Sequence, residues 1–443
     1  MESKTFVTIV DNQKGAVAVT VAILMIMLVG FAALAIDVGY IYVTRGELQN
    51  VADAAALAAT RELGAIYEGM SYEEQQSFNC GSVATAPCSQ IVAVAQQTAL
   101  ENQAANVNIV VNASDVQIGH WDFSVAPPFT AANDPMNIWP GNNPDPAPLV
   151  RPRAVRVTAR RQEGSNSPIT TFLAGVIGVD TMGVSALATA SLSGEATAGK
   201  GELELPVGIS RWFFDQWRDD PPGTAPAYCN DEIAFSPANS PDSCAGWTSW
   251  DYNSNDNMLR NILEGGLEEP ADNDYASPAI GSGEGAVDEL NYIGGDLSVP
   301  TFDDLLTLFQ HKGIDVDLEG NPVDAGAGIA LCDRIDSDPE DVHSHVCDDD
   351  HDLDTTRLYY PDGTPRNLHQ WETSVVVYES GDCANPNQSM AVAGFATVLL
   401  TEVLGPPSKS IKALIKCDYV QQVPTHGGGG DYGTLGSIPG LVQ

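Results

Sequence analysis

The sequence predicts an α+β protein. An N-terminal transmembrane helix extends into an α+β unit with a small antiparallel sheet, and a β-rich, disulfide-containing domain with a large acidic insertion follows. Three observations predict this arrangement. Residues 16–36 form an uncharged apolar run that continues into a helical pattern, later segments alternate polar and apolar residues as half-buried strands do, and most of the acidic residues lie after residue 200.

Residues 16–36 are long enough to cross a membrane as one helix. Twenty-one residues at a rise of 1.5 Å each span about 31 Å, close to the hydrocarbon thickness of a bilayer. Beyond Asp37 an apolar helical face continues to about Leu63. We therefore expect one helix that crosses the membrane and protrudes beyond it, with residues 1–15 as a short arm on the other side.

A cleaved secretory signal peptide is the alternative interpretation of this segment. Ala33, Leu34 and Ala35 form a small-residue cleavage pattern before Ile36, and cleavage there would release a secreted protein, for example a hydrolase. The apolar run is longer than a usual signal core, and the helical pattern continues through the cleavage position. Both features favour a retained anchor.

The charges and cysteines around the helix predict its orientation. Lys4 and Lys14 precede it, and basic residues favour a cytoplasmic N-terminal arm. All the cysteines follow it, and an even number confined to the translocated side fits an oxidising periplasm. This predicts a single-pass inner-membrane protein. The eight disulfide candidates are Cys80, Cys88, Cys229, Cys244, Cys332, Cys347, Cys383 and Cys417.

Proximity in the sequence suggests pairing each cysteine with its neighbour along the chain. The suggested pairs are Cys80 with Cys88, Cys229 with Cys244, Cys332 with Cys347, and Cys383 with Cys417. Eight cysteines allow 105 connectivities, so the neighbour pairing is one hypothesis among many. Zinc binding is the competing use, and the absence of any Cys-x-x-Cys motif disfavours it.

The negative charge is concentrated in the second half of the chain. Residues 1–200 hold 10 Lys and Arg against 17 Asp and Glu, a net charge of −7, whereas residues 201–443 hold 10 against 42, a net charge of −32. Such a field repels phosphate backbones, so we expect no nucleic-acid partner.

We expect the unit over residues 37–195 to combine the protruding helix with a second helix and a small sheet. An Ala/Gln-rich segment predicts the second helix, Pro168 suits the first turn of a short one, and β-branched and aromatic residues predict strands. The predicted elements are a helix over 89–106, strands over 107–111 and 116–123, a strand over 153–160 with arginines on one face, a helix over 169–177 and a strand over 183–192.

Two features of the first helix carry further expectations. Its alanine-rich run, residues 52–59, and Gly39 have little bulk and permit close packing against another helix, in the same chain or in a neighbour. We favour intramolecular packing for the alanine run, because it belongs to the apolar face of the helix. Asp37 ends the apolar segment, where we expect its carboxylate to be hydrated at the membrane interface.

The second half predicts an acidic, β-rich domain over residues 200–425. A small polar linker precedes it, and framework strands bracket an insertion over residues 210–370 that contains a helix over 303–310. We expect residues 426–443, which include four consecutive glycines, to form a flexible tail. The framework strands are predicted over 203–209, 372–378, 390–402 and 410–420, and the aromatic residues Trp212, Phe213, Phe214 and Trp217 would line either a ligand groove or a core.

The first part of the chain carries motifs with a specific order and spacing. They are Gly15-Ala16-Val17-Ala18-Val19, the apolar run, Ala35-Ile36-Asp37-Val38-Gly39-Tyr40 and Leu48-Gln49-Asn50-Val51-Ala52-Asp53-Ala54-Ala55-Ala56-Leu57-Ala58. These segments closely resemble the N-terminal region of the TadE/TadG-like group of Tad (tight adherence, Flp pilus) assembly proteins. Residues 118–122, 154–158 and 185–190 fit the same family, so the resemblance covers residues 14 to about 193.

The resemblance implies a pilin-like unit and a structural role. It implies a membrane-anchored component of a Tad (Flp) type IV-like pilus, acting through contacts with other pilus-assembly or pilin proteins in the periplasm. Pilin-like relatives are cut after a glycine and carry glutamate at the fifth mature position, whereas here Thr20 stands five residues after Gly15. This departure favours the TadG-like type that keeps its anchor. The metal motif of the von Willebrand A domain of some relatives does not occur.

Acidic loops in the insertion raise the hypothesis of calcium binding, because calcium takes six to eight oxygen ligands. The first loop opens like an EF-hand, but Gly326 occupies the twelfth position, where a bidentate glutamate is needed. A solvated acidic surface is the simpler interpretation. The candidate ligands are Asp315, Asp317, Glu319, Asp348, Asp350 and Asp352, and His343, His345 and His351 are weaker candidates for a transition metal.

No catalytic motif accompanies these loops. The chain has no Gly-x-Ser-x-Gly, no phosphate-binding glycine loop and no His-Glu-x-x-His, so we predict that it is not an enzyme and has no resident cofactor apart from the hypothetical calcium. The alternative function is a surface-exposed minor pilin or adhesin whose acidic insertion binds calcium or a ligand.

Overall fold

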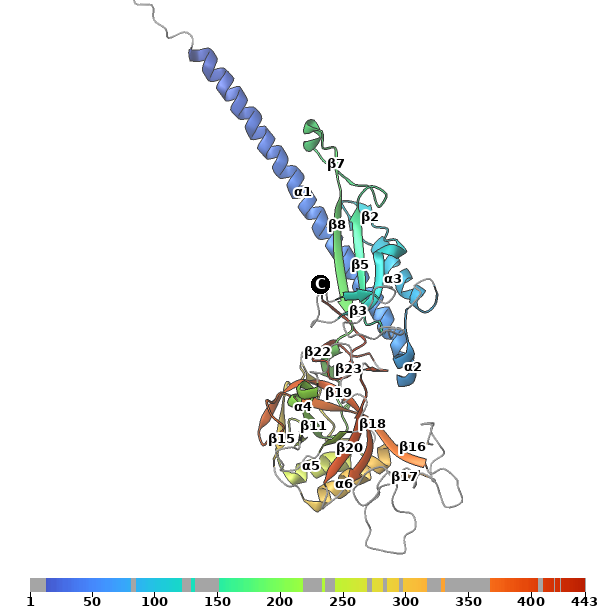
Figure 1. The fold of residues 1–443 in the computed structure, drawn as a ribbon. Helices are drawn as coiled ribbons and strands as arrows, with labels where there is room; N and C mark the ends of the chain where they lie inside the picture. Colours follow the sequence, from blue (N-terminus) through green and yellow to red (C-terminus); the bar gives the residue numbers. More distant parts are fainter. Residues whose placement is uncertain are drawn as a thin grey trace, which may run out of the picture.

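The computed structural model places a long N-terminal helix, an α+β unit wrapped around that helix, and a β-rich unit at its far end (Figure 1). The structure describes residues 13–80, 85–121, 129–131, 151–217, 233–235, 244–268, 273–281, 285–294, 298–316, 328–330, 367–404, 409–417, 419–422 and 424–442.

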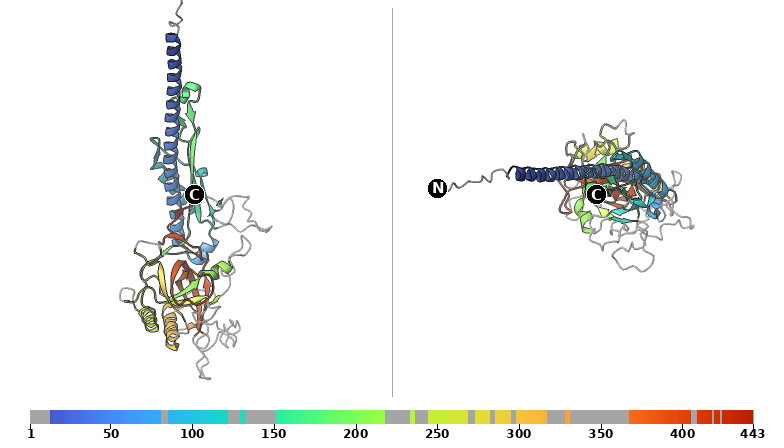
Figure 2. Two further views of the ribbon diagram at one scale, coloured as in Figure 1. Left: turned by 90° about the vertical axis from the view of Figure 1, so that its left-hand side faces the viewer. Right: turned by 90° about the horizontal axis from the view of Figure 1, so that it is seen from above.

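Helix α1 (Gln13–Glu68) is continuous over 56 residues and changes surroundings along its length. Large apolar side chains from Val17 to Val38 are about half exposed or more, whereas Leu48, Ala56 and Leu63 are fully buried. Among the described residues, α1 is the one helix that is long and apolar enough to cross a membrane. One helix therefore presents an apolar surface at its N-terminal end and forms the core of the α+β unit at its C-terminal end. Figure 2 shows the N-terminal part of α1 extending beyond that unit.

The N-terminal unit packs α1 between helix α3 (Cys88–Leu100) and one face of a sheet. The sheet has the order β24-β8-β5-β3-β4. Its central pair, β5 and β8, is antiparallel and runs from Ala154 opposite Ser191 to Arg161 opposite Val184. The sheet strands are β3 (Val116–Trp121), β4 (Phe129–Ala131), β5 (Ala154–Arg161), β8 (Val184–Ser191) and β24 (Gly440–Leu441), and the small elements of the unit are α2 (Tyr72–Ser77), β1 (Gln103–Ala104), β2 (Val107–Asn108) and η1 (Ala113–Asp115).

The alternation of polar and apolar residues predicted β5 correctly, and the strand predicted over 183–192 is β8, but the helix predicted over 169–177 is wrong. Strand β6 (Ile169–Thr170) instead pairs with β7 (Thr181–Met182), and only Ala174–Ile177 forms a short 3₁₀ turn, η2. The β-branched pair at 169–170 favours a strand, and Gly178 ends the turn in the left-handed conformation, with φ of 88°. We call residues 169–182 the β6–β7 hairpin.

The C-terminal unit is built around a ring of strands. The sheet path β12-β20-β19-β15-β13-β11-β18-β16 contains an additional β19–β18 pairing, which joins β19, β15, β13, β11 and β18 into a closed ring of five. Its strands are β11 (Val207–Ser210), β12 (Ile233–Phe235), β13 (Ala245–Thr248), β15 (Glu289–Ile293), β16 (Ile314–Val316), β17 (Gly328–Ala330), β18 (Asn367–Tyr378), β19 (Ser389–Leu404) and β20 (Ser410–Ile415).

The two faces of this ring pack against different clusters of side chains. Tyr292 and Tyr378 belong to the cluster on one face, and residues of two helices belong to the cluster on the other. Tyr292 and Tyr378 lie with ring centroids 4.8 Å apart. A Cβ at Gly208 would lie 2.1 Å from the Tyr292 hydroxyl, so glycine is needed for this close approach. The opposite face carries a core that includes residues of α5 and α6. The helices are α4 (Arg211–Trp217), α5 (Asp256–Gly265) and α6 (Val299–Lys312), and a separate pair of strands is β10 (Thr197–Ala198) with β14 (Ile280–Gly281).

The prediction of a flexible tail over residues 426–443 is wrong for the described residues, which end at 442. The chain returns from the C-terminal unit to the N-terminal one, where β24 pairs with β8. The glycines mark close approach of backbones, since a Cβ at Gly429 would lie 2.1 Å from the Glu195 carbonyl oxygen. The small sheet at this junction has the order β21-β23-β9-β22, with β21 (Tyr419–Val420), β23 (Thr434–Leu435), β9 (Gly194–Glu195) and β22 (Gly427–Gly429).

The disulfides confirm one suggested pair and contradict two. Cys80 is bonded to Cys88. Cys244 is bonded to Cys383, so Cys244 does not pair with Cys229, and Cys383 does not pair with Cys417. Cys417 is also disulfide-bonded. The neighbour pairing is wrong for Cys244 and Cys383 because the fold places the start of β13 beside the turn after β18. The two cysteines are 139 residues apart in the sequence. Residues 229, 332 and 347 lie outside the described part of the chain.

Candidate functional site

The end of the N-terminal unit nearest the apolar run is organised around Asp37. This residue is only 3% exposed, and its carboxylate accepts backbone N–H bonds from Phe172 at 2.7 Å, Leu173 at 3.0 Å and Ala174 at 2.7 Å. The Phe172 ring also meets Tyr40 edge to face, with centroids 5.5 Å apart. Asp37 is therefore not the hydrated interfacial charge that the sequence suggested. It fixes the β6–β7 hairpin to α1 where the apolar run ends.

We predict that Asp37→Asn loosens this hairpin. Both carboxylate oxygens of Asp37 accept N–H bonds, whereas asparagine has one acceptor oxygen and an amide nitrogen that only donates. The substitution also removes the negative charge that strengthens these hydrogen bonds. Amide hydrogen exchange at residues 172–174 should accelerate by at least about tenfold in the detergent-solubilised full chain. Exchange in β5 should not change, and unchanged protection of residues 172–174 would contradict the assignment.

The alanine run packs within the chain, as expected. Ala52, Ala55, Ala56 and Ala59 are fully buried against α3 and the sheet. A Cβ at Gly39, by contrast, would meet no atom within 4 Å, so packing within this chain does not require that glycine. The alanine run therefore joins α1 to its own sheet.

Arg156 and Arg160 of β5, and Arg153 just before this strand, make specific contacts with neighbouring elements. Arg160 forms an ion pair with Asp115 at 3.0 Å. The Arg156 guanidinium lies 4.0 Å from the centroid of the Phe129 ring. Arg153 reaches Asp431 of the returning tail at 2.9 Å. On the arginine face that the alternation predicted, Arg156 thus contacts β4 and Arg160 contacts η1, while Arg153 links the start of the strand to the tail.

Of the predicted calcium ligands, only Asp315 lies in the described residues. It belongs to β16, and its carboxylate lies 2.8 Å from Nδ1 of His369 on β18. The described residues contain no group of three or more His, Cys, Asp or Glu side chains arranged to hold a metal ion. Calcium binding stays a prediction. The other candidates, at positions 317, 319, 343, 345, 348, 350, 351 and 352, lie outside the described part of the chain.

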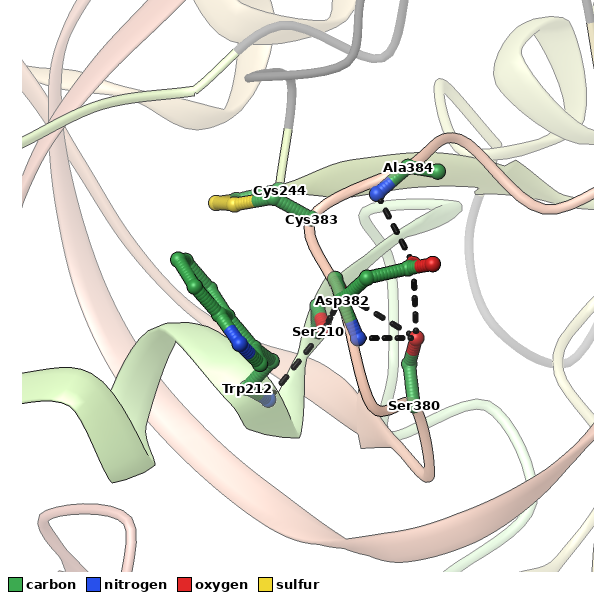
Figure 3. Close-up of a disulfide and its surroundings, with 7 residues drawn as sticks. All are labelled: Ser210, Trp212, Cys244, Ser380, Asp382, Cys383 and Ala384. Carbon is green, nitrogen blue, oxygen red and sulfur yellow. Dashed lines mark hydrogen bonds between the residues drawn. A yellow bond between two sulfur atoms is a disulfide. The ribbon is translucent and has the colours of Figure 1, made fainter.

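The aromatic cluster of α4 contributes to a core. Phe214 is fully buried and meets Tyr432 of the returning tail with ring centroids 5.1 Å apart. Figure 3 shows the Trp212 indole beside the Cys244–Cys383 disulfide, and its backbone N–H donates to Ser210 Oγ at 3.2 Å. Of the two interpretations of this cluster, Phe214 therefore supports the core.

Glu195 on β9 is a buried carboxyl that the sequence did not indicate. Its side chain is only 2% exposed, and burial, followed by the nearby Glu202 charge, raises its pKa to about 8, although a hydrogen bond with Gln421 opposes the shift. The surrounding small polar residues suggested a solvated linker. The tail covers this position, and no local pattern in the sequence reveals that long-range contact.

The described part of the chain thus combines one helix that is long and apolar enough to cross a membrane with a hairpin fixed to it where the apolar run ends. Residues 15–62 match the family described as putative Flp pilus-assembly TadE/G-like, and residues 76–190 match the family described as putative Tad-like Flp pilus-assembly. Both matches lie within the part of the chain that resembles the TadE/TadG-like group, and they confirm that resemblance. These are pilus-assembly families and not enzyme families. No curated protein and no solved structure matches the chain.

Proposed function

We propose that this protein is a single-pass inner-membrane component of a Tad (Flp) pilus, acting through protein–protein contacts in the periplasm. The observation that carries the proposal is the continuity of α1 within a Tad-like region. The exposed apolar part of the helix has the length and composition of a membrane anchor, and the buried part is the central element of the N-terminal unit.

The mechanism is mechanical. Because α1 has no break between its apolar run and the packed core, force on the folded units passes directly to the anchor. The tail joins the two units through Arg153–Asp431 and through the pairing of β24 with β8. The C-terminal unit is thereby held in a defined position, where it contacts other pilus-assembly proteins or pilins.

Deletion and fractionation test this function. Loss of the gene should abolish or reduce surface filaments, the intact chain should restore them, and the protein should remain in the inner membrane after the filaments are sheared off. A chain that co-purifies with sheared filaments would instead support the minor pilin or adhesin, and calcium-dependent adhesion would support its proposed ligand. Normal filaments in the deletion strain would contradict the role in pilus assembly.

A further inference from the structure

The β6–β7 hairpin carries an exposed apolar surface that the described residues of the chain leave largely uncovered. The exposed fractions are 66% for Phe172, 37% for Leu173, 40% for Val179 and 40% for Met182. Solvent-exposed apolar side chains gathered on one short segment mark an interaction surface. Residues 169–182 contain a single charged residue, Asp180, and no lysine or arginine.

The position of the hairpin indicates what covers it. Figures 1 and 2 show it beside α1, farther toward the N-terminal end of the helix than the rest of the unit. At this level α1 itself exposes apolar side chains, including Ile36 at 55% and Val38 at 50%. The apolar surface of the hairpin is thus continuous with the surface of α1 that faces lipid if α1 spans the membrane.

The hairpin backbone is suited to a partly dehydrated setting. The Thr171 N–H donates to the Asp180 carbonyl at 3.1 Å, and the Val179 N–H donates to the Ala174 carbonyl at 3.0 Å. Asp37 accepts the three N–H groups at residues 172–174. Backbone groups that already have partners lose little when water is removed, which is a requirement at a membrane surface.

We propose that the β6–β7 hairpin inserts Phe172, Leu173, Val179 and Met182 into the interfacial layer of the bilayer from which α1 emerges. This second contact rests on the proposed membrane anchoring of α1. A single transmembrane helix leaves the folded units free to tilt and rotate relative to the bilayer. A second membrane contact at the hairpin, to one side of α1, fixes both the tilt and the rotation.

Site-specific photo-crosslinking tests the contact. The full chain, carrying p-benzoyl-phenylalanine in place of Phe172, is reconstituted in phosphatidylethanolamine and phosphatidylglycerol vesicles, irradiated and analysed by mass spectrometry. We expect lipid adducts at position 172. The same probe at Phe31, 72% exposed within the apolar run, should also give lipid adducts, and at Ile314, 54% exposed in the C-terminal unit, it should give none.

The three positions separate the two claims. Adducts at position 31 without adducts at position 172 would overturn the hairpin contact and leave the anchor in place. An absence of adducts at both positions would overturn the anchor and the hairpin contact together. Protein adducts alone at position 172 would also overturn the lipid contact and indicate a second copy of the chain as the occupant. Asp37→Asn should lower the lipid adduct yield at position 172 but not at position 31.

Discussion

Replacing Gly64 by alanine should detach the C-terminal tail from α1. A Cβ at position 64 would lie 2.2 Å from the Ser437 carbonyl oxygen, a backbone atom that cannot rotate away. The adjacent tail backbone is held by hydrogen bonds from Gly427 N–H to the Ile438 carbonyl and from Ile438 N–H to the Thr425 carbonyl. Overpacking of this kind costs about 1–3 kcal/mol, occasionally more, and here the tail is the segment that can move.

The measurement is limited proteolysis and thermal unfolding of the detergent-solubilised full chain. Gly64→Ala should expose the tail to proteases and lower the unfolding midpoint. Gly46→Ala is the matched control in the same helix, because a Cβ there meets no atom within 4 Å. It should be neutral or stabilise the helix by up to about 1 kcal/mol. Equal behaviour of the two variants would show that the tail does not dock against α1.

The stability of the junction between the two units should fall as pH rises from about 4.5 to about 8. Glu195 is buried in the small sheet that joins them, and burial raises its pKa from the ordinary value of 4.5 to about 8. Between these values the folded chain holds a proton that the unfolded chain has lost, so each increase in pH favours unfolding. The contribution is fully present below about pH 4.5 and is lost above about pH 8, a total on the order of 5 kcal/mol.

Glu195→Gln should remove most of this pH dependence, because the amide is neutral throughout and has a similar shape. The unfolding midpoints of both chains are compared at pH 5, 7 and 9. The midpoint of the variant should exceed that of the natural chain most clearly at pH 9. Glu202→Gln is an informative second variant. It removes the neighbouring charge but leaves the burial, which is the larger cause of the shift, so most of the slope should persist. Parallel pH profiles for the natural chain and Glu195→Gln would contradict the assignment.

Local sequence patterns predicted the helices and strands that have a buried face at a regular spacing of residues. The apolar run and the alanine face of α1 have helical periodicity, and β5 and β8 alternate because one face of each strand lies on α1. The prediction for residues 169–177 was wrong because their apolar side chains suggested a helix. Its backbone N–H groups instead find their acceptor in Asp37, more than 130 residues earlier in the sequence.

The contacts between segments that are far apart in the sequence are the part of the structure that the sequence did not reveal. Four consecutive glycines are typical of a flexible linker, yet Gly429 and Gly430 serve close backbone contacts with β9 and the Tyr432 ring. The same contacts bury Glu195, and the ring of strands brings Cys244 to Cys383. Each of these features depends on which distant segment comes to lie beside it, and a single sequence carries no periodic signal for that partner.

The proposed function requires that α1 be one uncleaved helix that is both the membrane anchor and the core of the folded unit. Intact-mass spectrometry of the protein from carbonate-washed inner membranes tests it most directly. The chain should stay in the membrane pellet with α1 complete, including residues 13–36. A chain recovered from the soluble fraction, or one that begins at Ala16 or Ile36, would contradict it.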